Sequence, residues 1–183
     1  MFVSTVNTML SLLTVLGQIL IILLVISFFV HKREGNFLLN FFKKYAFIIA
    51  FIVALASTLG SLFYSDIAGY EPCKLCWFQR IFMYPQAIIL GMALWRKDKN
   101  IGIYSLVLSV VGAIIAGYHY LLQLGIAPSL PCSAVGYSVS CSQRFIMEYG
   151  YITIPMMSLT AFVLIIIAMM ISQNVRNGDN IKS

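Results

Sequence analysis

Charged residues are scarce in this sequence. Lysine, arginine, aspartate and glutamate make up 10% of the 183 residues, whereas a soluble globular domain carries about 25%. Acidic residues number six and histidines two. The sequence also lacks internal repeats, low-complexity tracts and a glycine-rich phosphate-binding loop. These shortages argue against an ordinary soluble domain, a repeat protein and a P-loop nucleotide-binding protein.

Hydrophobic residues make up 61% of the chain and fall in long runs. A helix needs about 20 mostly apolar residues to cross a bilayer. Five segments reach that length: Val6–Val30, Tyr45–Tyr64, Trp77–Trp95, Ile101–Leu124 and Tyr151–Ile171. The first has no basic residue before it and no small-residue cleavage site, so we expect an uncleaved helix and not a signal peptide. The sequence therefore predicts an all-α integral membrane protein with five transmembrane helices.

Basic residues are the charge in excess, and the formal net charge is +6. They lie between the apolar segments, which indicates membrane topology and not binding to a polyanion such as nucleic acid. Alternate connections hold most of them: Lys32, Arg33, Lys43, Lys44, Arg96, Lys97, Lys99, Arg176 and Lys182. Because positive residues stay in the cytoplasm, we expect the N-terminus outside and the C-terminus in the cytoplasm.

Cysteine is sparse as well, and the four cysteines form two local pairs. Cys73 and Cys76 lie in Glu-Pro-Cys-Lys-Leu-Cys-Trp-Phe-Gln-Arg, residues 71–80, which opens the third apolar segment. The unpaired N–H groups and the dipole of a helix start favour a thiolate, which is the form that attacks disulfides. This pattern alone also fits half of a zinc site or a structural disulfide. On the predicted topology both pairs face the outside, where disulfides persist.

The second pair, Cys132 and Cys141, lies in the loop 125–150. Their spacing allows a disulfide, and an exposed loop disulfide is open to attack by an external thiolate. Two other interpretations remain: a structural disulfide that only closes the loop, and a zinc site made by all four thiolates. For residues 142–149 the sequence fits a short surface helix and an irregular loop equally well.

Two polar residues are expected to lie beneath the first cysteine pair. Arg80 follows Cys76 by four residues and shares its helix face, and an intramembrane arginine is functional unless it only extends to the headgroups. His119 lies five residues before Leu124, at a depth similar to that of Arg80, although a lone histidine is more often a packing residue. Together they suggest a pocket for an amphipathic molecule with a polar head, such as a membrane quinone.

Two motifs resemble those of one family. Cys-Lys-Leu-Cys-Trp-Phe-Gln-Arg, continued by Ile-Phe-Met-Tyr-Pro, is similar to the thiol:quinone oxidoreductases of the disulfide bond formation protein B (DsbB) family, particularly its Gram-positive BdbC branch. His119-Tyr-Leu-Leu-Gln-Leu, followed by Pro128 and Cys132, resembles the second signature of that family. The resemblance covers roughly residues 45–171 and extends to the four cysteines and the topology.

The resemblance implies a four-helix transmembrane bundle over residues 45–172, with two extracytoplasmic cysteine loops, in a bacterial plasma membrane. Residues 1–31 would then be an extra N-terminal transmembrane helix without a counterpart in the family pattern. Residues 32–44 would be a cytoplasmic basic linker, and residues 173–183 a cytoplasmic tail.

The resemblance also implies an activity. The protein would reoxidise the dithiol of a thioredoxin-fold partner similar to DsbA or BdbD, and pass the electrons to ubiquinone or menaquinone. By position, Cys132 would be attacked by the partner, with Cys141 as its mate, and Cys73 would exchange with that loop pair. The loop between Cys132 and Cys141 is shorter than in many relatives, which leaves the order of the relay steps open.

Three further residues have roles by the same resemblance. Cys76 would be the cysteine nearest the quinone, with Arg80 and His119 in the quinone pocket. Two alternatives stay open: a quinone oxidoreductase similar to vitamin K epoxide reductase, which the Trp-Phe-Gln-Arg continuation disfavours, and a non-enzymatic membrane scaffold with structural disulfides.

Overall fold

The computed structural model describes residues 2–30, 37–128 and 140–180. These residues form five α-helices: α1 (Phe2–Val30), α2 (Phe37–Leu62), α3 (Lys74–Arg96), α4 (Gly102–Gln123) and α5 (Ile154–Asn180). A π-helical turn, η1 (Phe63–Ile67), extends α2, and a 3-10 turn, η2 (Lys99–Ile101), precedes α4. The described residues contain no β-strand, only an isolated bridge between Glu148 and Ile152. The prediction of an all-α protein is confirmed.

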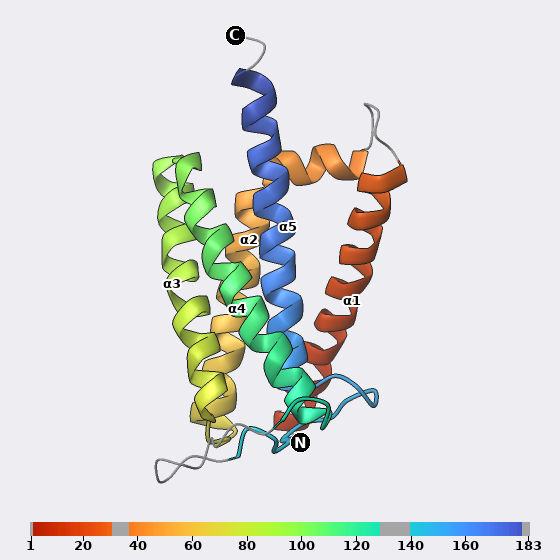
Figure 1. The fold of residues 1–183 in the computed structure, drawn as a ribbon. Coiled ribbons are helices and arrows are strands. Elements are labelled where there is room, and N and C mark those ends of the chain that lie inside the picture. The colour runs from red at the N-terminus through yellow and green to blue at the C-terminus, as the bar shows by residue number, and fades with distance from the viewer. Residues whose placement is uncertain (1, 31–36, 129–139, 181–183) are drawn as a thin grey trace.

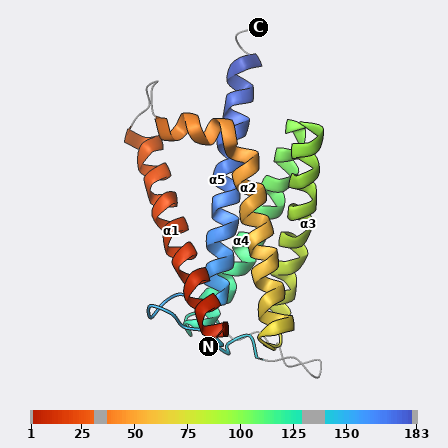
Figure 2. The ribbon, with the colours of Figure 1, turned by 180° about the vertical axis from the view of Figure 1, so that it is seen from behind.

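Four stretches are long and apolar enough to cross a membrane, and they lie in α1, α2 with η1, α4 and α5. This indicates a multi-pass membrane protein. The expected fifth span, α3, is not among these four in the described chain, because polar residues such as Gln79, Arg80 and Gln86 reduce its apolar character. It nevertheless packs along α2 and α4 (Figure 1, Figure 2), so we treat it as part of the membrane bundle.

Helix α5 is the common neighbour of the other helices. It packs extensively on α4 and α2, and α1 packs mainly on α5 and to a smaller extent on α2. Figure 1 and Figure 2 show α1 and α3 on opposite sides of α5. The N-terminus, the start of α3 and the loop 140–153 lie at one end of the bundle, and the C-terminus lies beyond the other. We call the first end the dithiol end, because Cys73 and Cys76 lie there.

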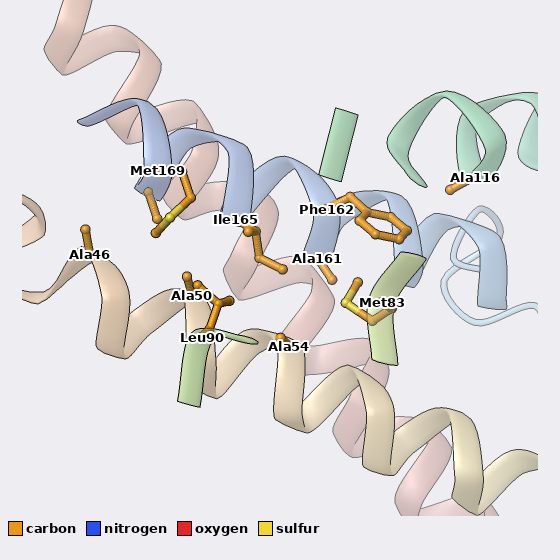
Figure 3. Close-up of a cluster of buried hydrophobic side chains, with 11 residues drawn as sticks. Ala46, Ala50, Ala54, Met83, Leu90, Ala116, Ala161, Phe162, Ile165 and Met169 are labelled. Carbon is orange, nitrogen blue, oxygen red and sulfur yellow. The ribbon is translucent and has the colours of Figure 1, made fainter. Parts of the chain in front are cut away.

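Small residues let these helices approach closely, as in other membrane bundles. One face of α2 carries alanines at intervals of four, at Ala46, Ala50 and Ala54, and all three are buried. Figure 3 shows Ile165 and Met169 of α5 pointing toward this alanine face. The packing therefore alternates small side chains on α2 with large ones on α5.

Two helices extend into segments that the sequence analysis described as a linker and a tail. The expected linker 32–44 is partly helical, because α2 already begins at Phe37, and residues 31–36 lie outside the described residues. Figure 1 shows the first part of α2 lying across the bundle before the helix turns along it. Phe42 is buried there while Lys43 and Lys44 are exposed, which is typical of a helix at a membrane surface. The expected tail also begins as helix, since α5 continues to Asn180.

The loop before α5 is irregular, so residues 142–149 do not form a surface helix. The chain turns at Tyr149 and Gly150, which have φ values of 52° and 78°. Glu148 and Ile152 exchange backbone hydrogen bonds of 3.0 and 2.9 Å across this turn. Buried Ile146 and Ile152 hold the loop against the bundle, close to the dithiol.

Candidate active site

The dithiol lies where α3 begins. Cys73 is the N-cap residue of α3, and its carbonyl oxygen accepts a hydrogen bond from the Trp77 amide at 3.1 Å. Cys76 follows one helical turn later, so its sulfur lies only 3.1 Å from that of Cys73. Both are free thiols, with Cys73 buried and Cys76 half-buried. The two sulfur atoms can therefore close into a disulfide with little movement of the backbone.

The surroundings of Cys73 favour its thiolate. The hydrogen bond with the Cys76 thiol lowers the pKa of Cys73 to about 4, and the interaction with His119 acts in the same direction while burial opposes both. The free N–H groups at the start of α3 also favour a negative charge at this position. Cys73 is therefore charged at neutral pH and is the better nucleophile of the two cysteines.

His119 connects the dithiol to the loop before α5. Its side chain is 1% exposed, and its Nε2 lies 3.6 Å from Cys73 Sγ and 3.1 Å from the Cys141 carbonyl oxygen. A carbonyl oxygen only accepts, so Nε2 carries the proton. Nδ1 then accepts from the Gln79 amide nitrogen at 2.9 Å. These contacts hold the imidazole in one orientation, with an N–H group beside the Cys73 sulfur.

Cys141, from the second cysteine pair, also lies beside the dithiol. Cys141 is disulfide-bonded and packs with Cys73 and Leu122 in one buried cluster. Its expected partner, Cys132, lies outside the described residues. The side chain of Gln123 donates to the Gln143 carbonyl at 3.1 Å and so holds the loop on α4. The structure thus brings Cys73, Cys76, His119 and Cys141 together.

A large cavity opens on the other side of the dithiol. Its volume is about 360 Å³, and its walls come from α1, α2 with η1, α3, α5 and the adjoining loops. Its lining is mostly apolar, but Cys76, Gln79, Arg80 and Tyr64 contribute polar groups. Cys73 is not part of the described lining. The two cysteines therefore differ in what they face: Cys73 faces His119 and the loop, and Cys76 faces the cavity.

Arg80 is held in the cavity wall by α2. Its Nε donates to Ser61 Oγ at 2.9 Å, and its Nη2 donates to the Ser61 carbonyl oxygen at 3.1 Å. The guanidinium also lies 5.3 Å from the centre of the Trp77 ring. Ser61 therefore uses two of the five N–H donors of the guanidinium, which directs the cationic group toward the cavity rather than to bulk water.

Sequence reasoning missed two residues of this site. Tyr64 is 5% exposed, and its hydroxyl has no hydrogen-bond partner among the described residues, although it lines the cavity. No sequence signal marked it, because a tyrosine at the end of an apolar segment is typical of the membrane interface. Gln79 lines the cavity and also contacts His119. Its spacing of three residues from Cys76 could have placed it on the dithiol face.

The structure does not bring Arg80 and His119 around one pocket. No α4 residue is in the described lining of the large cavity, and His119 instead lines a small cavity of about 20 Å³ together with Cys73 and Cys76. Gln79 lies between the two sites, since it lines the large cavity and hydrogen-bonds His119. The predicted pocket is therefore divided into an Arg80 side and a His119 side.

The sulfur and imidazole groups could also hold a metal ion. The ligand atoms of Cys73, Cys76 and His119 all lie within 4.8 Å of one another, and thiolate and imidazole are the ligands that zinc prefers. A site made by all four thiolates differs from this arrangement, because Cys141 is already disulfide-bonded.

Comparisons with known proteins identify the family of the chain. A model of the family described as "Disulfide bond formation protein DsbB" matches residues 43–172. The chain is 43% identical over 123 residues to "Probable disulfide formation protein C" of Bacillus cereus, which covers 67% of this chain and 88% of that protein. It is 44% identical over 122 residues to "Disulfide bond formation protein C" of Bacillus subtilis, covering 66% and 86%. No solved structure shows significant similarity to the chain.

The matched region begins in α2 and ends in α5, so it contains both cysteine pairs, Arg80 and His119. Helix α1 lies outside it. The resemblance found in the sequence motifs is confirmed, and the chain belongs to the DsbB family of disulfide bond formation proteins.

Proposed function

We propose that this protein generates disulfides by reoxidising the dithiol of a thioredoxin-fold partner and passing the electrons to a membrane quinone. The observation that carries the proposal is the position of the dithiol between two sites. Cys73 contacts His119 and packs against Cys141, whereas Cys76 lines the large apolar cavity with Arg80. A dithiol between a loop disulfide and a lipophilic cavity can receive electrons on one side and release them on the other.

Electron entry would follow thiol–disulfide exchange. A partner thiolate attacks Cys132 of the loop disulfide, and Cys141 leaves as a thiolate. The second partner thiol then resolves the mixed disulfide, so that the partner is oxidised and the loop pair is reduced. The loop pair in turn reduces the Cys73–Cys76 disulfide by the same chemistry. Each exchange breaks one S–S bond, forms another and moves two electrons.

His119 serves this exchange in our proposal. Its N–H group lies beside Cys73 Sγ and also donates to the Cys141 carbonyl oxygen. It therefore holds the loop next to Cys73 and stabilises the thiolate that forms when the Cys73–Cys76 disulfide is broken. This assigns His119 to sulfur exchange and leaves Arg80 as the cationic residue of the quinone site.

The cavity residues fit a quinone. Tyr64 has an unpartnered buried hydroxyl in the described lining, and Arg80 keeps N–H donors beyond those that Ser61 uses. Both can donate to a carbonyl oxygen, and the apolar walls suit an isoprenoid tail. A bound quinone would take up the two electrons and two protons of the dithiol. Arg80 would stabilise the negative charge that develops on the oxygen, in a site prepared by Ser61.

Reduction of quinone by the purified protein in detergent, with a reduced thioredoxin-fold partner as electron donor, tests the proposal. We expect quinone reduction that depends on all four cysteines. A mixed disulfide with a trapped partner should form through Cys132, and it should disappear in Cys132→Ser. A wild-type protein whose cysteines keep their redox state when quinone is added would instead support a scaffold with structural disulfides.

The same proposal places the dithiol end outside the cytoplasm of a bacterial cell. The basic residues between alternate apolar segments support this orientation. A membrane-impermeant thiol reagent should label all four cysteines in intact, reduced cells. Labelling only after lysis would reverse the orientation.

A further inference from the structure

Helix α1 forms part of the wall of the large cavity, although it lies outside the region that the family model matches. Leu10, Leu13 and Thr14 of α1 form one part of the wall, opposite residues of α2 and α5. A helix that only anchored the chain in the membrane would not need to face the site. Helix α1 would therefore contact part of any ligand that fills the cavity.

Specific contacts hold α1 on α5. A Cβ atom at Gly17 would lie 3.1 Å from Leu164 and 3.2 Å from Thr160, so the glycine permits this close approach. The Gln18 side chain donates to Thr160 Oγ1 at 3.3 Å and accepts from the Tyr151 hydroxyl at 2.9 Å. Polar contacts of this kind hold membrane helices in one orientation. The α1 face that lines the cavity is thus fixed by its packing on α5.

The cavity has a polar part and an apolar part along the bundle axis. Cys76, Arg80 and Tyr64 line it near the dithiol end. Farther along α2, the lining includes Val53 and Ile52, and the nine residues from Ser61 to Ile52 correspond to a rise of about 13 Å. Leu13 of α1 and Leu164 of α5 also belong to the apolar part, whereas Leu10 lies against Gly60, next to Ser61. The site is therefore long enough for a polar head and the first part of an apolar chain.

We propose that α1, α2 and α5 form a subsite for the isoprenoid tail of the quinone, so that α1 determines which tails this protein accepts. This rests on the quinone function proposed above. The tail chemistry matches the wall, because an isoprenoid chain has no polar group and can pack closely against the leucine side chains. The polar head stays with the guanidinium of Arg80 and the hydroxyl of Tyr64, whereas α1 contributes two leucines and Thr14 to the wall.

A pair of tryptophan substitutions on α1 tests the subsite. Leu13 lines the cavity and its neighbour Leu12 does not, and the two side chains are similarly exposed, at 58% and 52%. In the full-length purified protein, Leu13→Trp would place a ring in the subsite, and Leu12→Trp would add the same ring to the outer surface. Two quinones with the same head are compared, one without a tail and one with several isoprene units. Quinone that stays bound after gel filtration is extracted and quantified.

We expect Leu13→Trp to weaken binding of the long-tailed quinone at least about tenfold more than binding of the tailless one, because the added ring would occupy space that only the tail fills. Leu12→Trp should bind both quinones like the wild type. Leu13→Ala, which shortens the same side chain without adding bulk, should change the ratio in the same direction as Leu13→Trp, so the result does not depend on the folding of the tryptophan variant alone.

The outcomes separate this proposal from the proposed function. Equal weakening of both quinones by Leu13→Trp and Leu13→Ala, or a ratio in Leu12→Trp as altered as that in Leu13→Trp, would overturn the tail subsite and leave the quinone function standing. A wild-type protein that binds neither quinone would overturn the proposed function and the subsite with it.

Discussion

The two cysteines of the dithiol differ because their surroundings differ. Cys73 stands before the first turn of α3, next to an imidazole N–H group and a thiol, whereas Cys76 lines an apolar cavity. A thiolate is stabilised by the first environment and not by a low-dielectric one. In the function that we propose, this asymmetry gives each sulfur one role: exchange with the loop at Cys73 and contact with the quinone cavity at Cys76.

The charge on Cys73 should be measurable. Because its pKa is lowered to about 4 from an ordinary value of 9.0, the reduced protein should show thiolate absorbance that is constant above about pH 5.5 and disappears toward pH 3. Since the folded pKa is the lower one, this thiolate stabilises the folded state above pH 9, and the contribution is lost as the pH falls from 9 to 4. Cys76→Ala, which removes the hydrogen-bond donor, should shift the titration to higher pH. A titration near pH 9 in the wild type would contradict the assignment.

Arg80 and Tyr64 should affect quinone use more than sulfur exchange. Loss of a preorganised donor costs about 2.7–4 kcal/mol in well-shielded sites, and we expect less for Arg80→Ala at a membrane interface. Tyr64→Phe should cost about 0.5–1.5 kcal/mol in quinone affinity, the value of one hydrogen bond. Steady-state kinetics with varied quinone and varied partner measures both effects. Tyr104→Phe, at a tyrosine that is 66% exposed and outside the cavity lining, is the control.

An unchanged dependence on quinone in Arg80→Ala would reduce Arg80 to a membrane anchor held by Ser61.

The position of Arg80 relative to Cys76 could be predicted from the sequence, because spacing along one helix determines which residues share a face. The sequence could not predict which face of α4 carries His119. Depth follows from position along the helix, but the rotation of α4 relative to α3 depends on packing between them.

At the scale of elements, Gly112 determines how closely α4 and α5 pack. A Cβ atom at Gly112 would lie 2.3 Å from the Phe162 ring, and Phe162 is fully buried. Gly112→Ala should therefore destabilise the protein by about 1–3 kcal/mol, as overpacking does in well-packed cores. Gly117→Ala is the matched control on the same helix, because no described atom outside its own helix turn lies within 4 Å of the position that its Cβ atom would take. Unfolding in a denaturing detergent compares the two variants.

The control should be neutral or slightly stabilising, since alanine is favoured over glycine in a helix by roughly 0.5–1 kcal/mol. Equal effects of the two substitutions would show that the α4–α5 contact is more adaptable than the structure indicates. The sequence could place both glycines on one helix, but it could not tell which of them meets a ring.

Helix positions were predictable because a membrane span is a signal of composition over about 20 residues. The expected segment Trp77–Trp95 corresponds to α3, Lys74–Arg96, and Ile101–Leu124 corresponds to α4. The surface part of α2 was harder to predict, because its aromatic and basic residues fit a linker as well as a helix. The loop before α5 has buried isoleucines at its turn, and such long-range burial has no local signature.

At the scale of the molecule, the cavity depends on elements far apart in the sequence. It is lined by Leu10 of α1, Arg80 of α3 and Leu164 of α5. The packing face of α1 does have a sequence signal, although a weak one. Asn7, Ser11, Thr14 and Gln18 follow one another at spacings of three and four residues and so share one helix face. In the structure Ser11 and Thr14 are buried, and Gln18 and Gly17 contact α5.

Deletion of residues 1–30 tests how far the redox chemistry depends on α1. The four cysteines, Arg80 and His119 all lie after α1 in the sequence. The hydrogen bonds that position the Cys73, Arg80 and His119 side chains go to α2, α3, α4 and the loop before α5. The truncated chain would keep Lys32 and Arg33 near its start, and with them the orientation signal.

We therefore expect a truncated protein that still inserts and reduces a tailless quinone with the partner as donor. It should lose much of its preference for long-tailed quinones, because the deletion removes Leu10 and Leu13 from the cavity wall. The same truncation with Cys73→Ala gives the background rate. Complete loss of activity in a correctly inserted and folded truncation would show that α1 is needed for the redox site itself, and not only for the wall beside it.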